Sequence, residues 1–442
     1  MNLRKLSVSR YNVTSEFEIT SVVESIRRNS FAWDEKTSKI VSKILDKVKN
    51  EGDRALISFE RKFDSKRISK ARDLGVSRRE FSEAYSKVKP EEIDAMKTAY
   101  KQIQWLAIQQ MKRFSRVKLV SPLGFEINER YVPFRRVGGY IPGGLASYPS
   151  TVLMVCALAN VARVRELVLA TPSREVDGKV NEALLVAAHI CGVKHIIKAG
   201  GAQAIAALAY GTKSISKVDL IVGPGNAYVT EAKRQVSSSG EVVIDGLAGP
   251  TELLIMADGK SSPKFIVEDL ISQAEHGNRT LCGVVSDSQN LLNRVEERLS
   301  RISSRKRIDQ IREAKLFTVK VRSKKLAFRF VQAFAPEHLE SMISSREVET
   351  ITNSGLVLLG DYTPCSSTDY IVGTNHILPT EGTASKFAGL GVENFLKRVT
   401  LVKGGKKSLR RSSKYISSLA LLEGFPNHAS AAISRFDKRG EI

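Results

Sequence analysis

The feature that most constrains the fold is a regular alternation of short apolar runs and helical stretches between residues 132 and 285. The apolar runs are rich in β-branched residues and predict strands at 166–170, 195–199, 219–222, 241–244 and 253–257. The stretches between them predict helices at 181–191, 202–210 and 227–236. Apolar strands separated by crossover helices are typical of a parallel sheet with both faces covered. Such a sheet binds ligands beyond the carboxyl ends of its strands.

Glycine-rich loops recur at the ends of these predicted strands, at 138–144, 200–203, 223–226 and 249–252. Glycine lets the backbone approach a ligand closely, and a helix N-terminus favours phosphate. None of the loops is a GxGxxG motif followed by an acidic residue, so the Rossmann dinucleotide fingerprint is absent. One glycine turn is ordinary in an α/β fold, but four in succession favour a nucleotide or other anion site.

The flanking regions are less informative. Residues 22–117 are predicted to be helical, with apolar residues at helical spacing in 41–56 and 93–108 and a turn at Gly52 and Asp53. Residues 286–325 are basic and are also predicted to be helical. A predicted strand at 356–359 leads into a long polar loop at 360–380, and loops of that length are usually functional. The tail, 415–432, predicts an amphipathic helix interrupted at 424–426.

The stretch Phe-Ala-Pro-Glu-His-Leu-Glu at 334–340 offers an acid and an imidazole side by side. An apolar strand or short helix at 326–334 precedes it, and Pro336 predicts the first position of a new helix. Glu337 and His338 would then share a first helical turn, where histidine can transfer protons and glutamate can activate water. A capping glutamate beside a half-exposed histidine is the alternative interpretation.

Possible metal ligands occur in three other places. Gln273 and His276 are three residues apart in a predicted helix at 266–277, so one face of that helix presents both. Glutamine is an unusual ligand, and a plain surface helix explains the pair as well. In the polar loop, Asp369 offers a carboxylate, and His376 is either a ligand or a structural hydrogen-bonding group. The tail carries Glu423 and His428.

Charge and composition exclude several classes of protein. The net charge is +22, but the basic residues are scattered, and the densest cluster, 397–414, lacks interleaved aromatic residues. This indicates a solvated basic surface rather than a specific nucleic-acid site. No secretory signal and no apolar run of membrane-spanning length is found. Four separated cysteines fit a reducing cytoplasm and argue against a cysteine-built zinc site.

Taken together, these motifs resemble histidinol dehydrogenase from about residue 52 to residue 428. The likeness is strongest at 140–150, 200–211, 218–236, 272–276, 335–340, 369–380 and 422–428. The resemblance implies an α/β fold with two incomplete Rossmann-like parallel-sheet domains and helical terminal segments that intertwine in a dimer. The expected domains are an N-terminal segment (1–25) packing with the C-terminal segment, a zinc-carrying catalytic domain (26–135 with 245–380), an NAD-contacting domain (136–244) and a C-terminal dimerisation segment (381–442).

The resemblance also implies an activity: oxidation of L-histidinol through an aldehyde to L-histidine with two NAD, the last step of histidine biosynthesis. The enzyme would be a cytoplasmic, zinc-dependent homodimer with shared active sites and one Zn²⁺ per subunit. Glu337 and His338 would be catalytic. Zinc would be held by Gln273, His276, Asp369 and the partner subunit's His428. NAD contacts would fall at Tyr140, Gln203 and Asn226, and substrate contacts at Thr251, Gln273, His276, His338, Asp369, Glu423 and His428.

Three positions depart from the family pattern: Thr251 stands where serine is usual, Gly277 where an acidic residue is typical, and Thr368 where glycine is. The implied roles are chemically coherent, because histidinol can chelate one metal through its imidazole and amine, and His338 can take the alcohol proton. Alternative hypotheses are a related zinc- and NAD-dependent dehydrogenase of another polar alcohol such as a sulfonated diol, a zinc hydrolase, and a basic nucleic-acid-binding protein.

Overall fold

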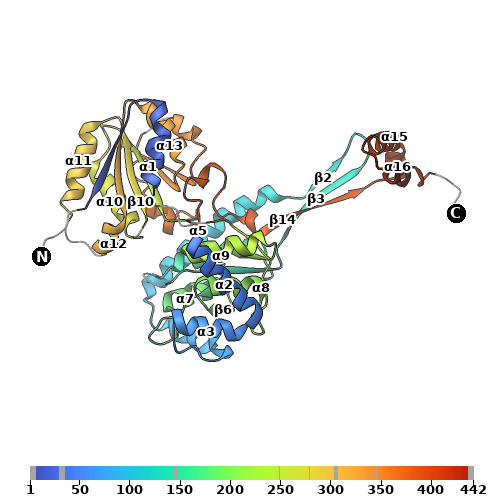
Figure 1. The fold of residues 1–442 in the computed structure, drawn as a ribbon, viewed down its shortest axis with the longest axis horizontal. Coiled ribbons are helices and arrows are strands. Elements are labelled where there is room, and N and C mark those ends of the chain that lie inside the picture. The colour runs from blue at the N-terminus through green and yellow to red at the C-terminus, as the bar shows by residue number, and fades with distance from the viewer. Residues whose placement is uncertain are drawn as a thin grey trace.

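The computed structural model describes residues 6–28, 35–143, 147–247, 249–277, 279–302, 307–343 and 346–436. The chain forms two lobes, each built on a parallel sheet, and a long arm that projects from the body and ends in two helices (Figure 1). The predicted α/β fold with parallel sheets is thus confirmed. Gly144, in the first glycine-rich loop, lies outside the described residues. Among the described residues, no helix is long and apolar enough to cross a bilayer.

A five-stranded sheet organises one lobe, with strand order β6-β5-β4-β7-β8 and every pairing parallel. Its strands are β4 (Arg136–Tyr140), β5 (Glu166–Thr171), β6 (His195–Lys198), β7 (Leu220–Val222) and β8 (Val243–Ile244). The connecting helices are α6 (Pro149–Val161), α7 (Glu182–Ile190), α8 (Gly201–Tyr210) and α9 (Ala227–Ser238). The strands and helices predicted between 166 and 244 are therefore confirmed, with boundaries shifted by one or two residues.

The N-terminal helices complete this lobe by covering the helices on both faces of its sheet. They are α2 (Glu35–Glu51), α3 (Asp53–Phe63), α4 (Arg78–Tyr85) and α5 (Pro90–Met111). α2 packs against α8 and α9, whereas α4 and α5 pack against α7 and α6. The expected grouping of 26–135 with 245–380 is therefore wrong for 35–111, because the apolar faces of these helices are buried in the other lobe.

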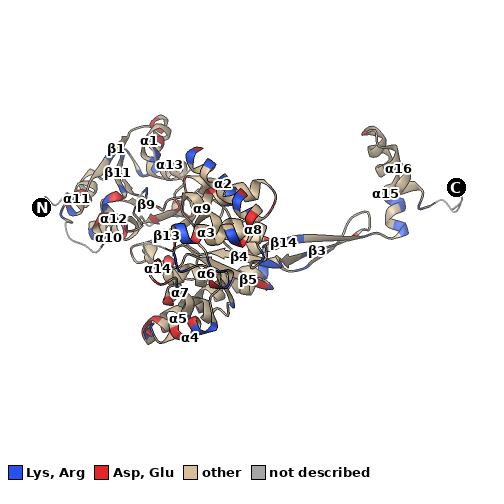
Figure 2. Cartoon of the chain, turned by 60° about the horizontal axis from the view of Figure 1, so that its bottom comes forward, with Lys and Arg blue, Asp and Glu red and all other residues tan. Residues whose placement is uncertain are grey.

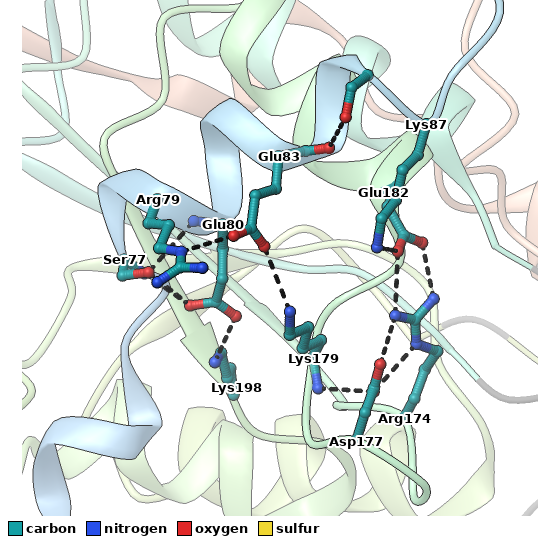
Figure 3. Close-up of polar contacts among 11 residues, drawn as sticks. Ser77, Arg79, Glu80, Glu83, Lys87, Arg174, Asp177, Lys179, Glu182 and Lys198 are labelled. Atoms are coloured by element: carbon teal, nitrogen blue, oxygen red, sulfur yellow. Dashed lines mark hydrogen bonds and ion pairs between the residues drawn. The ribbon is translucent and has the colours of Figure 1, made fainter.

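Ion pairs add a polar connection where α4 meets α7 and β6 (Figure 3). Glu80 of α4 pairs with Lys198 of β6 at 2.7 Å, and both side chains are largely buried. Glu83 of α4 contacts Lys179, which lies just before α7, at 3.3 Å. The pairing lowers the pKa of Glu80 although burial acts in the opposite direction. This helix is therefore attached by charge as well as by its apolar face.

A six-stranded sheet organises the second lobe, with strand order β1-β11-β10-β9-β12-β13, again entirely parallel. Its strands are β1 (Val8–Val13), β9 (Glu252–Ala257), β10 (Leu281–Ser286), β11 (Lys315–Val321), β12 (His338–Ser341) and β13 (Leu356–Leu359). Its helices are α1 (Ile19–Arg27), α10 (Pro263–Ala274), α11 (Gln289–Ser300), α12 (Ile308–Glu313) and α13 (Lys324–Phe334). Thus β9, which the alternating pattern places in series with the strands of the first sheet, lies in the second sheet, on the 245–380 side of the expected domain boundary.

Two predictions in this lobe are corrected. β11 lies within 286–325, which was predicted to be helical throughout; its apolar run is short and is flanked by basic helical sequence. The N-terminal segment, expected to pack with the C-terminal one, instead joins this sheet: β1 pairs with β11, and α1 packs against α13. Residues 1–5 lie outside the described residues.

The prediction of a helix starting at Pro336 is wrong. α13 ends at Phe334, and Ala335 adopts the left-handed conformation (φ 47°) that closes a helix. Glu337 then precedes β12, whose residues pair in parallel with β9 and β13. Proline is equally compatible with the residues that precede a strand, so Pro336 by itself does not distinguish a helix from a strand. The pairing of β12 with two neighbouring strands determines that this segment is a strand.

The arm is a three-stranded antiparallel sheet, with order β14-β3-β2, that carries α15 and α16 away from both lobes (Figure 1). Its elements are β2 (Val117–Val120), β3 (Glu126–Pro133), β14 (Leu396–Lys403), α15 (Lys406–Leu422) and α16 (Pro426–Ile433). The helix break predicted at 424–426 is confirmed, with Gly424 at φ 79°. Basic side chains occur on α15 and on both lobes, as expected for a dispersed basic surface (Figure 2).

Candidate active site

A cavity of about 460 Å³ lies between the two lobes. One wall comes from loops at the carboxyl ends of β4 and β7, and the other from the amino ends of β9, β10 and β12. The prediction that ligands lie beyond the carboxyl ends of strands therefore holds for the first sheet and is wrong for the second. In the second lobe, α10 returns antiparallel to the strands, so its C-terminal residues reach the amino edge.

Glu337 and His338 lie together on the cavity wall, where the chain enters β12. Both are almost fully buried, with 6% and 2% of their surfaces exposed. His338 Nδ1 lies 3.6 Å from Glu337 Oε2, and the backbone N–H of Glu252 donates a 2.8 Å hydrogen bond to the same oxygen. The neighbouring strand β9 therefore fixes the carboxylate. The half-exposed histidine of the alternative interpretation is excluded.

The charge state of His338 follows from these neighbours. Burial opposes a positive charge on its imidazole, but Cys365 and Glu337 favour that charge and outweigh burial. The pKa of His338 is therefore raised well above its ordinary value. The neighbouring carboxylate therefore stabilises the positive charge that the imidazole carries once it has gained a proton.

Gln273, His276 and Asp369 converge on the same cavity from two separate segments. Gln273 lies in the last turn of α10 and His276 lies two residues beyond its end. Asp369 lies in the short helix α14 (Cys365–Tyr370), and its Oδ2 accepts a 3.1 Å hydrogen bond from Gln273 Nε2. An amide oxygen, an imidazole nitrogen and a carboxylate oxygen are donors that zinc accepts. The donor types of these three residues, all on one cavity wall, therefore suit a zinc ion.

Sequence reasoning missed Cys365, although it lies next to this group. One ligand atom each from His338, Cys365 and Asp369 lies within 4.8 Å of the other two. Cys365 is fully buried, and burial raises the pKa of its thiol to about 12, so the thiol is neutral. The sequence did contain one indication of its position: Cys365 stands four residues before Asp369, so in a helix the two side chains lie on the same face.

His376 belongs to the cavity wall as a structural group. Its Nε2 lies 2.9 Å from Thr151 Oγ1 at the start of α6, and burial lowers its pKa, so the ring is uncharged. This contact joins the long polar loop to the first lobe. Thr151, which also lines the cavity, was not identified from the sequence.

Two of the three predicted NAD contacts are buried beneath the cavity region rather than on its wall. Tyr140 and Gln203 are 4% and 2% exposed. The N–H of Gly201 donates to Tyr140 Oη at 3.1 Å, and Gln203 Nε2 donates to Glu60 Oε1 at 3.0 Å. Glu60 Oε1 also accepts the N–H of Gly200 at 3.2 Å. The N-terminus of α8 is therefore occupied by the carboxyl group of Glu60, so this glycine-rich loop does not present a free N–H group of Gly200 to an anion in the cavity.

The loop at 223–226 is different, because it faces the cavity. Asn226 is exposed there and caps α9, its Oδ1 accepting the N–H groups of Tyr228 and Val229 at 3.1 and 3.2 Å. Thr251, another predicted contact, also lines the cavity. Of the predicted residues, seven thus lie on the cavity wall: Asn226, Thr251, Gln273, His276, Glu337, His338 and Asp369.

Glu423 and His428 do not join this group within one chain. Glu423 follows α15 and His428 lies in α16, at the far end of the arm from both lobes (Figure 1). Both are exposed. Large apolar side chains beside them are also exposed, including Leu422 at 82% and Phe425 at 51%.

The geometry agrees with the comparison to known proteins. The family model for histidinol dehydrogenase matches residues 27–436, nearly the whole chain. The chain belongs to the histidinol dehydrogenase family. It is therefore placed among oxidoreductases of histidine biosynthesis.

Individual histidinol dehydrogenases support this assignment. The chain is 39% identical to that of Methanococcus maripaludis over 401 residues, covering 90% of this chain and 93% of the relative. It is also 39% identical to that of Nitrosomonas europaea over 409 residues, covering 91% and 93%. The crystal structure of histidinol dehydrogenase from Elizabethkingia anophelis superposes with a TM-score of 0.91 at 33% identity, and 98% of each chain is covered.

Proposed function

We propose that this chain oxidises L-histidinol through L-histidinaldehyde to L-histidine, using two NAD and one zinc ion per subunit, as the last step of histidine biosynthesis. The observation that carries this proposal is the convergence on one cavity of Glu337 and His338 with Gln273, His276 and Asp369. These residues come from separate segments of the chain. Their chemistry combines a proton acceptor, a water-activating carboxylate and three metal donors.

The chain's own residues supply proton transfer and orientation. Gln273, His276 and Asp369 would hold zinc, which when bound would orient the imidazole and amine of the substrate, while bound NAD would supply the hydride acceptor for each oxidation. His338 takes the alcohol proton in the first oxidation. Glu337, held by the Glu252 N–H, draws a proton from the water that adds to the aldehyde. His338 gives its proton to the aldehyde oxygen as the water adds, so it is free to take a hydroxyl proton of the hydrate in the second oxidation.

The proposed domain roles follow the walls of the cavity. Residues 136–244 would contact NAD, chiefly through the loop at 223–226, whose residues Pro224, Gly225 and Asn226 line the cavity. The buried pair Tyr140 and Gln203 would act by supporting the backbone of the adjoining loops. Thr251 would contact the substrate, with a methyl group where the family usually has serine.

We further infer a homodimer in which the arm supplies the missing ligand. Gln273, His276 and Asp369 would supply three of the four ligands that zinc usually takes, while the exposed arm tip carries His428 and Glu423 among apolar side chains. Residues 381–442 would then dock on the partner, and the partner subunit's His428 would complete the zinc site. The partner's Glu423 would approach the substrate.

The activity is tested by following NADH formation with L-histidinol and NAD. We expect two NADH per histidinol consumed. His338→Ala and Glu337→Ala should abolish turnover while zinc content stays near that of the parent, and His195→Gln, at an exposed histidine far from the cavity, is the matched control. No NADH with any alcohol would contradict the proposal, and NADH only with other polar alcohols, such as a sulfonated diol, would refute histidinol as the substrate.

The shared site is tested by mixing two inactive variants. His428→Ala alone should lower zinc content, as should His276→Ala. In a random mixture, half of the dimers are heterodimers, and each has one intact site if the ligands cross the interface. About a quarter of the sites should therefore recover. No recovery beyond that of the unmixed variants would contradict ligands from two subunits.

A further inference from the structure

The side chains of His338, Cys365 and Asp369 form a compact donor group beside the proposed zinc ligands. A ring nitrogen, a sulfur and a carboxylate oxygen lie within 4.8 Å of one another. His276 is not part of this group, although it lines the same cavity. The group is reachable because His338 and Asp369 are on the cavity wall, with Cys365 directly behind them.

His338 provides a second, independent indication of a ligand. Its side chain is 3% exposed, and within the described part of the chain neither ring nitrogen has a hydrogen-bond partner; the Glu337 Oε2 atom lies 3.6 Å from Nδ1, just beyond hydrogen-bond distance. An unsatisfied buried polar group costs roughly 1–3 kcal/mol, so such groups are rare in folded proteins. Nε2 lies 3.9 Å from Asp369 Oδ1, close enough for both to bind one cation after a small adjustment.

Asp369 can serve both groups because its two oxygens face different neighbours. Oδ2 accepts a hydrogen bond from Gln273, the proposed zinc ligand, whereas Oδ1 is the oxygen nearest to His338. One carboxylate can therefore bridge two adjacent cations. The thiol makes the second position selective, because thiolate prefers d¹⁰ ions such as Zn²⁺ and Cd²⁺ over Mg²⁺ or Ca²⁺.

We propose that His338, Cys365 and Asp369 form a second, inhibitory metal site for a thiophilic divalent cation. Binding breaks the S–H bond of Cys365, releases its proton to solvent and forms a metal–sulfur bond without any change in oxidation state. His338 becomes a ligand and can no longer accept a proton. Excess zinc or cadmium should therefore inhibit the reaction that zinc at the first site supports. This consequence, unlike the binding itself, rests on the proposed function.

The test uses Cd²⁺ as the probe on the full-length, zinc-loaded protein. We expect one Cd²⁺ per chain to bind beyond the resident zinc, with an ultraviolet thiolate-to-cadmium charge-transfer band. Cys365→Ser should lose both the added equivalent and the band, and Cys365→Ala is a second variant without a buried hydroxyl. Cys191→Ser, at a buried cysteine in the other lobe, should keep both. Inhibition by excess zinc is compared with each variant's own uninhibited rate. Without the thiol, the zinc concentration needed for half-inhibition should rise roughly tenfold or more, since even the loss of a group that supports a metal ligand costs about 10–100-fold in affinity.

The outcomes separate this proposal from the proposed function. The same band and stoichiometry in the parent and in Cys365→Ser would overturn the second site, as would loss of the band in Cys191→Ser alone. Either result leaves histidinol oxidation intact. If the parent oxidised no histidinol but the cadmium results were as expected, the second metal site would stand and the enzymatic proposal would fail.

Discussion

The ion pair between Arg27 and Glu252 should be among the most important polar interactions of the six-stranded lobe. Arg27, the last residue of α1, lies with its Nη1 3.0 Å from Glu252 Oε1 and its Nη2 3.0 Å from Glu252 Oε2. Nη2 also donates to the carbonyl of Phe334 at 2.7 Å, and the guanidinium lies 4.5 Å from the centroid of the Phe334 ring. The two charged side chains are 8% and 2% exposed. The N-terminal segment is thereby joined to the strand that positions Glu337.

Replacing Arg27 by methionine keeps much of the volume but removes the cation that lowers the pKa of Glu252, which burial raises to about 7, so the carboxyl group loses its buried partner. Removing one partner of a buried pair typically costs about 3–5 kcal/mol. For a lobe of this size, each kcal/mol lowers the melting temperature by about 2–4 °C, so we expect a decrease on the order of 10 °C. Adding Glu252→Gln should recover part of the loss, because the unpaired charge is then removed while the N–H that holds Glu337 remains.

Calorimetry at a fixed protein concentration measures the effect, since the proposed dimerisation would make the melting temperature depend on concentration. Arg10→Met is the matched control: Arg10 also pairs with a glutamate, Glu296, but its side chain is 77% exposed. That exposed pair should contribute at most about 1 kcal/mol to the free energy of unfolding. The reasoning is refuted if Arg27→Met costs no more than Arg10→Met, or if the double variant is less stable than Arg27→Met alone.

Two further predictions concern the loops of the five-stranded lobe. Burial, and then the neighbouring Asp64, raise the pKa of Glu60 well above its ordinary value. The contribution of Glu60 to the free energy of unfolding therefore declines as pH rises from the ordinary carboxyl pKa towards the raised pKa of the folded state. Glu60→Gln still accepts the hydrogen bond from Gln203, so its melting temperature relative to the parent should increase with pH; a difference independent of pH would contradict this. A Cβ at Gly223, where φ is +116°, would lie 2.1 Å from the Tyr140 carbonyl oxygen. Gly223→Ala should therefore lower the free energy of unfolding by about 3 kcal/mol. It should also raise the KM for NAD more than it lowers kcat. Gly240→Ala, also at positive φ but with no atom within 4 Å, should cost only about 1–2 kcal/mol, and equal effects of the two substitutions would count against the steric argument.

Local sequence was sufficient where the physical cause of structure is local. The strands and helices between 166 and 244 were predicted because apolar β-branched runs and helical spacing are properties of a few adjacent residues. The break at Gly424 was predicted for the same reason. The chemistry of Glu337 and His338 could also be inferred, since an acid beside an imidazole offers proton transfer in many backbone conformations.

Only the tertiary structure decided how these pieces combine. Whether Glu337 and His338 enter a helix or a strand depended on β9 and β13, which are distant in sequence from β12. The placement of β9 in a second sheet reversed which strand ends face the cavity. Gln203 faces Glu60 rather than the cavity because α3 packs under the α8 loop. Tertiary packing also placed Cys365 beside His338 and Asp369 and put His428 at the end of the arm. None of these positions has a counterpart in the local sequence pattern.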